Sequence, residues 1–197
     1  MENENQFSVW PLIVDMLTSI LIIFVLFSFF NDLLKPEGIE QQLINIKRQA
    51  FMNALDQKFH SELDQKEIAR EGKFDYLKIT FSDKILFTSG NYALNEKGRG
   101  VLNRLAPIIK SNENMKNISR IQVEGHTDDI PLNKEFYPRN NWELSTARAI
   151  SVVDYLSTQL NVASGLFSAN GYGPNIPISN DRNKNRRIEI KIYFSAK

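Results

Sequence analysis

One acidic residue stands inside the most apolar stretch of the chain. The stretch runs from Pro11 to Phe30, and Asp15 is its one charged residue. An ionised carboxylate at the centre of a bilayer costs roughly 2.5–3.5 kcal/mol even on the mildest insertion scale, so such a group normally faces protein or water. Together with Thr18, one helical turn further on, Asp15 indicates a site that takes up and releases a cation inside a helix bundle. The alternative is that Asp15 lies near enough to the helix start to reach the lipid headgroups.

Three residues of the C-terminal half have the side chains of a hydrolytic triad, namely His126, Asp128 and Ser145. A serine nucleophile needs a sharp turn and an oxyanion hole, which leave a glycine pattern in the sequence. Ser145 instead lies inside a helical pattern. We therefore expect no enzyme, and we expect His126 to order its loop by hydrogen bonds.

Composition limits what else the chain can be. Its 197 residues, 42% of them hydrophobic, suffice for one domain and one membrane span. The net charge of +1 argues against a nucleic-acid surface, which needs a concentrated basic stripe. With no cysteine and two histidines, disulfides, thiolate chemistry and most metal sites are not expected. We predict no cofactor.

The apolar stretch is long enough to cross a membrane as a helix, and we expect this helix over residues 10–34. A cleaved signal peptide would carry a basic start and small residues at its end. The first nine residues instead contain Glu2 and Glu4 but no lysine or arginine, and Phe29 and Phe30 end the stretch. We predict a retained anchor behind a short tail of residues 1–9. Because the first basic residue is Lys35, charge gives little guide to orientation.

Residues 35–72 are predicted to form an amphipathic linker helix. Its apolar residues recur mostly three or four apart, at Ile39, Leu43, Ile46, Ala50, Leu55, Phe59 and Leu63. This stripe is expected to pack on the following domain or on a twin helix, and so to serve dimerisation and spacing. The charged run from Lys66 to Lys73 is predicted to be a solvent-exposed connector.

Residues 73–197 show strands alternating with helices, which predicts an α/β sandwich with helices on one side of a sheet. One strand pattern lies at Leu77–Phe81, and Ile85 and Phe87 continue it after a turn at residues 82–84. Two more lie at Ile118–Val123 and at Arg187–Phe194. The helix patterns lie at Asn95–Lys110 and Trp142–Leu160. Polar loops are expected at Gly125–Asp129 and around Gly171, Gly173, Pro174 and Pro177. Trp142 is expected in the core.

Four ordered motifs in this part of the chain resemble the OmpA-like peptidoglycan-binding domain. They are GHTDDIPL at 125–132, NWELSTARAISVVDYL at 141–156, GYGPNIP at 171–177 and NRRIEIKI at 185–192. The NWELSTARA form is most similar to the MotB branch. Upstream, the helix with an early Asp and then a Thr resembles the ion-carrying helix of MotB and of ZorB, the membrane subunit of the Zorya anti-phage system.

The resemblance implies a site for the diaminopimelate of the wall peptide. Asp128 corresponds to the carboxylate that receives the ammonium group, and Arg148 to the arginine that pairs with the carboxylate. One fixed anion and one planar cation suit such a zwitterion. The remaining implied site residues are Thr127, Asn141 and Leu144 as pocket walls, and Arg187 with Arg186 as further contacts or a structural pair. From the residues alone, an internal Asp128–Arg148 ion pair is the simpler interpretation.

The resemblance also implies a function. The chain would be the peptidoglycan-anchored B subunit of an ion-driven rotary stator, with Asp15 carrying H⁺ or Na⁺. A homodimer would sit inside five copies of a MotA-, TolQ- or ZorA-like multispan partner of the bacterial inner membrane, with the N-terminus cytoplasmic and the C-terminal domain periplasmic. The short spacer after the helix favours a ZorB-like role in defence. A MotB-like flagellar stator subunit and a passive tether between inner membrane and cell wall are the alternatives.

Overall fold

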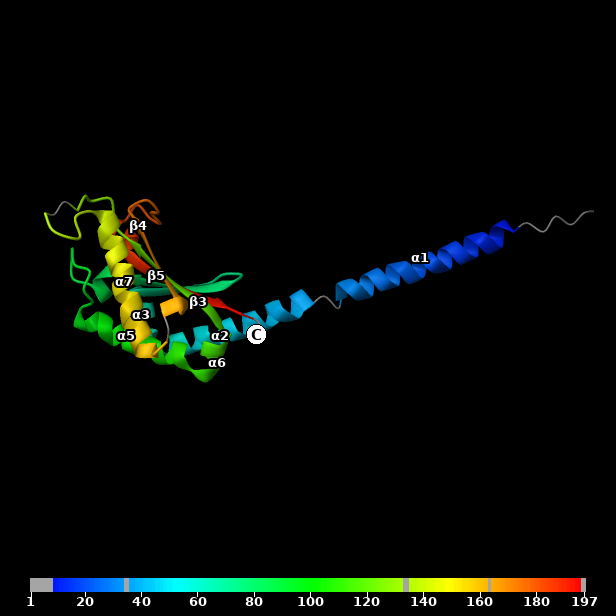
Figure 1. Cartoon of the computed structure of the whole chain (residues 1–197), viewed down its shortest axis with the longest axis horizontal. Helices are drawn as coiled ribbons and strands as arrows, with labels where there is room; N and C mark the ends of the chain where they lie inside the picture. The colour runs from blue at the N-terminus through cyan, green and yellow to red at the C-terminus, as the bar shows by residue number, and fades with distance from the viewer. Residues whose placement is uncertain (1–8, 34–35, 133–134, 163, 196–197) are drawn as a thin grey trace, which may run out of the picture. The chain divides into compact units, whose positions relative to one another are not determined.

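A computed structural model describes residues 9–33, 36–132, 135–162 and 164–195 (Figure 1). The chain divides into two compact units, residues 1–42 and residues 43–197.

Helix α1 (Trp10–Leu33) dominates the first unit and matches the predicted membrane segment. Its 24 residues make a helix about 36 Å long, against about 30 Å for the hydrocarbon core of a bilayer. The mean hydropathy of its most apolar window is 2.6, and none of its described side chains is buried. By length and composition α1 can therefore cross a membrane, where lipid or another protein would cover its apolar surface.

The second unit is built on a five-stranded sheet with the strand order β1-β2-β5-β3-β4. The strands are β1 (Ile68–Gly72), β2 (Tyr76–Ser82), β3 (Ile118–His126), β4 (Phe167–Gly173) and β5 (Arg187–Phe194). Neighbouring strands run antiparallel except β3 and β4, which run parallel. Helix α7 (Asn141–Leu160) packs on β3 and β4, and α5 (Glu96–Lys110) packs against α7 (Figure 1). The predicted α/β fold is confirmed.

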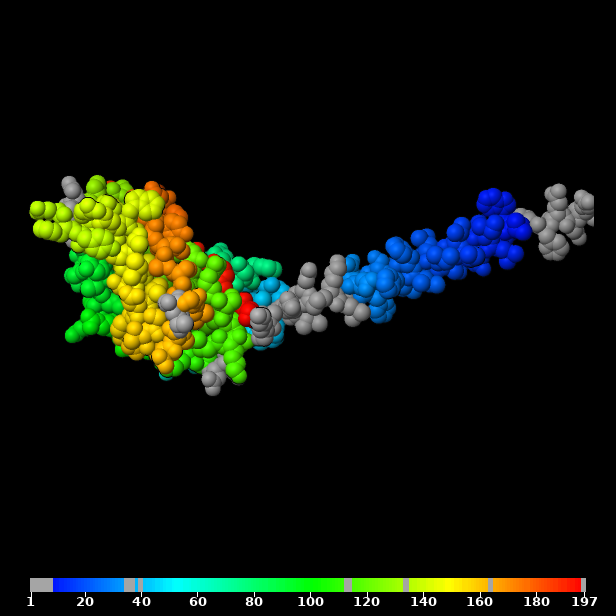
Figure 2. Space-filling view, in the orientation of Figure 1, coloured from blue at the N-terminus to red at the C-terminus, as the bar shows by residue number. Residues whose placement is uncertain are grey.

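Strand β4 replaces part of a predicted loop. Gly171 and Gly173 were expected in a turn, but both belong to this edge strand, which lies beside α7 in Figure 2. Its residues before Gly173 are all half-buried, so the sequence lacks the alternation that marks a strand. Gly171 allows the close packing, because a Cβ there would lie 2.1 Å from the Thr146 Oγ1.

Gly125 allows the same close approach on β3, and we expect its substitution to be costly. A Cβ at Gly125 would lie 2.0 Å from the Ser145 carbonyl oxygen, whereas a Cβ at Gly100 on α5 meets nothing within 4 Å. Gly125→Ala should lower the free energy of unfolding by about 3 kcal/mol through overpacking. Gly100→Ala should raise it by about 0.5–1 kcal/mol, since alanine favours the helix. Urea denaturation measures both, and equal stabilities would contradict the packing described.

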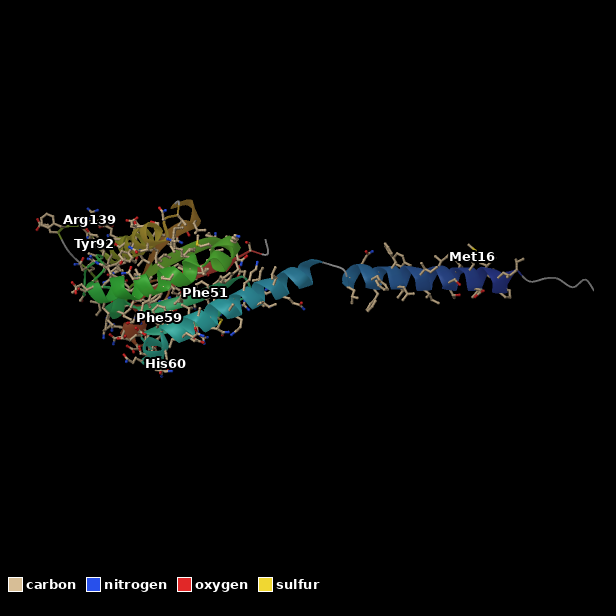
Figure 3. The ribbon with its side chains drawn as sticks, turned by 90° about the horizontal axis from the view of Figure 1, so that it is seen from below. Met16, Phe51, Phe59, His60, Tyr92 and Arg139 are labelled. Carbon is tan, nitrogen blue, oxygen red and sulfur yellow. The ribbon has the colours of Figure 1, made fainter. Side chains whose placement is uncertain are left out.

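The predicted linker helix is shorter than expected, and its second half belongs to the domain core. Helix α2 (Pro36–Lys58) presents Phe51 and Leu55, followed by Phe59, and all three are buried (Figure 3). The Phe51 ring meets the Phe194 ring edge-on at 6.0 Å between centroids. Packing of the predicted stripe on the domain was wrong at Leu43, Ile46 and Ala50, which are exposed in the single chain because the buried face passes through Phe51 instead. Packing of these residues on a twin helix stays a prediction.

The predicted connector at residues 66–73 was also wrong. The short helix α3 (His60–Asp64) is followed by β1, which pairs with β2 from Ile68 opposite Phe81 to Gly72 opposite Leu77. As an edge strand with mostly exposed side chains, β1 carries charged residues, and these hid its backbone pairing from the sequence pattern.

Strand β2 ends at Ser82, where a turn was expected, but the strand pattern does not continue after this turn as predicted. Ile85 lies in the short helix α4 (Asp83–Leu86), and Phe87 forms only an isolated bridge to Leu94. Ile85 and Phe87 are buried, so their spacing suited a strand, but a single helical turn buries the same residues. Two further short helices, α6 (Asn112–Asn117) and α8 (Arg182–Asn185), precede β3 and β5.

Candidate functional site

Six residues singled out from the sequence line one cavity of about 250 Å³. They are Thr127, Asp128, Asn141, Leu144, Arg148 and Arg186. The other lining residues are Asp83, Ser89, Gly90, Ile130, Pro131 and Leu132. Arg187, also singled out, is not among the described residues that line this cavity.

The sheet topology explains why distant segments meet here. Strands β2 and β3 both pair antiparallel with β5, so they point the same way and end at the same edge of the sheet. Asp83 directly follows β2, and Thr127 follows β3. Helix α7 begins at this edge with Asn140 as its N-cap, whose side chain accepts the Glu143 N–H (2.9 Å).

Helix α7 brings three of the lining residues onto one face. Asn141, Leu144 and Arg148 are three and four residues apart, the spacing of neighbours on a helix surface. The Asn141 side-chain amide donates to the carbonyl oxygen of Ile130 (2.8 Å), which fastens the loop after β3 to the start of α7.

Asp128 is buried but remains in contact with the cavity. One carboxylate oxygen accepts from the Arg186 guanidinium, and the other from the Ile130 N–H (3.3 Å). The neighbouring Thr127 N–H donates to the carbonyl oxygen of Gly173 (2.9 Å), which ties this loop to the end of β4. Asp128 is therefore a fixed anion at the cavity wall.

Arg148 is 2% exposed and held at three points. Its Nη1 pairs with the Asp83 Oδ1 (2.9 Å), and its Nε donates to the carbonyl oxygen of Asn91 (2.8 Å). The guanidinium also lies 5.1 Å from the centre of the Phe87 ring. Burial lowers the pKa of Arg148 and raises the pKa of Asp83, while the attraction between the two opposes both shifts.

An internal Asp128–Arg148 pair was the simpler interpretation from the sequence, and it was wrong. Arg148 pairs with Asp83, and Asp128 pairs with Arg186. The cavity thus contains two acids and two arginines, whose formal charges sum to zero. Sequence reasoning missed Asp83 altogether. Its position directly after a strand that ends at the same edge was the available signal.

Arg187 takes part in a separate buried network on β3 and β5. Its Nε donates to Glu189 (2.6 Å), and its Nη1 donates to the carbonyl oxygen of Ile176 (3.2 Å). Across the sheet, Lys191 pairs with Glu124 (2.8 Å). Burial would raise the pKa of Glu124, but His126 and Lys191 outweigh it and bring the pKa to about 2. The geometry gives Arg187 a structural pairing.

The carboxylates of Glu124 and Glu189 lie close to the His126 ring, in the only group with metal-ligand spacing among the described residues. Lys191 and Arg187 already neutralise both acids, so the cluster does not favour a cation. His126 does not order its loop by hydrogen bonds as predicted. Within the described chain its ring nitrogens make no hydrogen bond; Nε2 lies 3.8 Å from a Glu124 carboxylate oxygen, and the ring stacks on Tyr172 with 5.2 Å between centroids.

His126, Asp128 and Ser145 do not form a triad. The buried Ser145 hydroxyl donates to the carbonyl oxygen of Trp142 (3.0 Å) and accepts from the Gly173 N–H (3.0 Å). The serine thus fastens α7 to β4. Trp142 is 55% exposed, so its predicted place in the core was wrong. It lies one position beyond Asn141 and so points away from the cavity-lining face of the helix.

The second candidate site lies in the other unit, on α1. The Thr18 hydroxyl donates to the main-chain carbonyl oxygen of Asp15 (2.9 Å), as expected for residues one turn apart. The role of this pair in ion transport stays a prediction.

Several known proteins are similar to this chain in sequence or structure. Motility protein B of Bacillus subtilis is 32% identical over 162 residues, which cover 78% of this chain. The chain spans only 57% of that protein's length. The cell wall anchor of the T6SS from Pseudomonas aeruginosa has a TM-score of 0.62 at 29% identity, covering 72% of this chain and 97% of that one. The periplasmic domain of Helicobacter pylori MotB has a TM-score of 0.55 at 31% identity, covering 64% and 88%.

The predicted resemblance to MotB is thereby confirmed. A family model described as the OmpA family matches residues 86–191, more than half of the chain. The match runs from α4 through most of β5 and includes Asp128, Asn141, Leu144, Arg148 and Arg186. Fold, cavity and family model agree, and the chain belongs to the OmpA family.

Proposed function

We propose that this chain anchors an ion-driven membrane complex to peptidoglycan, as a MotB-like B subunit of a stator. The observation that carries the proposal is the cavity at the end of β3. Its wall contains an anion, Asp128, which is paired with Arg186, and a cation, Arg148, which is paired with Asp83. The named relatives support it, because one is a motility protein and another is a cell wall anchor.

Binding of the wall peptide follows from the charges of the cavity. The amino-acid end of diaminopimelate is a zwitterion, so it adds no net charge to a cavity that is itself neutral. The ammonium group of the ligand would replace the Arg186 guanidinium at Asp128. The carboxylate of the ligand would pair with the Arg148 guanidinium. Because Asp83 and Asn91 already hold Arg148 in place, little conformational entropy is lost on binding.

The membrane helix supplies the proposed ion site. Asp15 lies about one helical turn inside the start of α1, in a segment otherwise free of charge until Asp32. A carboxylate placed there is tolerated when other protein surrounds it. We propose that two copies of α1 sit inside a ring of five MotA-, TolQ- or ZorA-like subunits, with the N-terminus cytoplasmic and the domain of residues 73–197 periplasmic.

In this complex the chain binds peptidoglycan and holds the membrane complex in place, and it performs no covalent chemistry. Loading and unloading of H⁺ or Na⁺ at Asp15 would change its preferred contacts with the ring. Attachment to the wall would keep the dimer from turning, so that the ring moves relative to it. The short spacer between α1 and the domain favours a ZorB-like output in anti-phage defence over flagellar rotation.

Purification of the full chain from its native membrane tests this proposal. A stator subunit should come out with several copies of one multispan protein, because lone acids in apolar helices need a protein environment. Mass measurement of the detergent-solubilised complex gives the ratio, and we expect five partner copies to two of this chain. A passive tether would come out alone or as a simple dimer, and that outcome would contradict the proposal.

A further inference from the structure

The cavity is too small for a whole fragment of the wall. Its volume of about 250 Å³ lies below the range of roughly 300–1,000 Å³ that is usual for sites enclosing a complete small ligand. A wall fragment consists of a peptide joined covalently to a sugar chain. If the amino-acid end of the peptide fills the cavity, as the proposed function requires, the sugar must lie on the surface outside this cavity.

Two exposed aromatic rings lie in the loops that contribute residues to the cavity lining. Tyr92 and Tyr137 are 38% and 55% exposed, and their rings meet edge-on with 5.8 Å between centroids. Each follows cavity-lining residues in its own loop, Tyr92 after Gly90 and Tyr137 after Leu132. Figure 3 labels Tyr92 and Arg139 at the same end of the domain.

The main chain beside each ring is fixed by hydrogen bonds close to the cavity. The Asn91 side chain accepts the N–H groups of Tyr92 (2.8 Å) and Ala93 (3.1 Å), while its main-chain carbonyl accepts from Arg148 (2.8 Å). On the other side, the Arg139 main-chain N–H donates to Glu143 on α7 (2.8 Å). Tyr92 is therefore one residue from a direct contact of the cavity arginine, and Tyr137 lies in a loop fastened to the helix that carries this arginine.

We propose that Tyr92 and Tyr137 form a second binding subsite, which holds a sugar ring of the glycan strand. Exposed aromatic rings grouped beside a cavity are typical of binding surfaces. A pyranose ring has an apolar C–H face, which suits the electron-rich face of an aromatic ring, and polar edges, which suit the tyrosine hydroxyls. A subsite of this kind would make the chain a reader of the glycan as well as of the peptide.

Titration calorimetry with the full chain in detergent tests the subsite. The ligands are the stem tripeptide ending in diaminopimelate, alone and joined to its N-acetylglucosaminyl-N-acetylmuramyl disaccharide. We expect the disaccharide form to bind about tenfold more tightly, as two ring contacts would give. In the Tyr92→Ala/Tyr137→Ala variant this advantage should disappear, while binding of the bare tripeptide stays within twofold.

Matched variants locate the effect. Phe74→Ala removes an exposed ring from the turn between β1 and β2, and Trp142→Ala removes one from the other side of the α7 start. Both should keep the tenfold advantage. Equal binding of the two ligands by the unaltered chain, or loss of the advantage in Trp142→Ala and not in the tyrosine variant, would overturn the subsite. Failure of both ligands to bind would overturn the proposed function itself.

Discussion

Asp15→Asn is expected to abolish ion-driven work while the complex still assembles and still binds the wall. Asparagine has nearly the shape of aspartate, but it neither takes up a proton nor carries the negative charge that holds a sodium ion. Ion flux through proteoliposomes that contain the co-purified complex measures the effect, and we expect at least a hundredfold loss. Co-purification of the partner and pull-down with peptidoglycan should be unchanged.

Asp32→Asn is the matched control for this experiment. Asp32 is the other acidic residue of α1 and lies one residue before its end, where a helix leaves the hydrocarbon. Its substitution should leave the ion flux nearly intact. Full flux in the Asp15→Asn variant would remove Asp15 from the ion path, and the chain would then be better described as a tether.

Sequence patterns predicted the elements that obey local rules. Helices α5 and α7 have regular apolar faces and polar N-caps, and β5 alternates over its whole length, so all three were located within one residue. Six of the cavity residues could be grouped because the motifs that contain them, among them those around Asp128 and Arg148, resemble one family. Their meeting at one sheet edge follows from the strand directions, which the structure shows.

Elements stabilised by their surroundings could not be predicted in this way. Strand β4 is half-buried and rich in glycine, because α7 needs the space at Gly171, so no side-chain alternation marks it. Strand β1 is charged because it lies at an edge. The pairing of Arg148 joins residues 65 positions apart in sequence, and the choice of Asp83 over Asp128 depends on the turn after β2. The sequence around Arg148 therefore does not predict which of the two aspartates it pairs with.

The second large effect is expected at Asp128. Asp128→Asn keeps the size of the side chain but removes the charge that would receive an ammonium group, so binding of the wall peptide should weaken about tenfold to a hundredfold. Asp129→Asn is the control, because Asp129 is the adjacent residue, is exposed and pairs with Arg182 (2.6 Å). It should bind like the unaltered chain.

Calorimetric titration of the full chain with the diaminopimelate tripeptide tests the central claim most directly. The proposed site predicts saturable binding of one tripeptide per chain, lost or strongly weakened in Asp128→Asn and retained in Asp129→Asn. Binding that is equally strong in all three proteins, or absent from the unaltered chain, would contradict the assignment of the cavity to the cell wall.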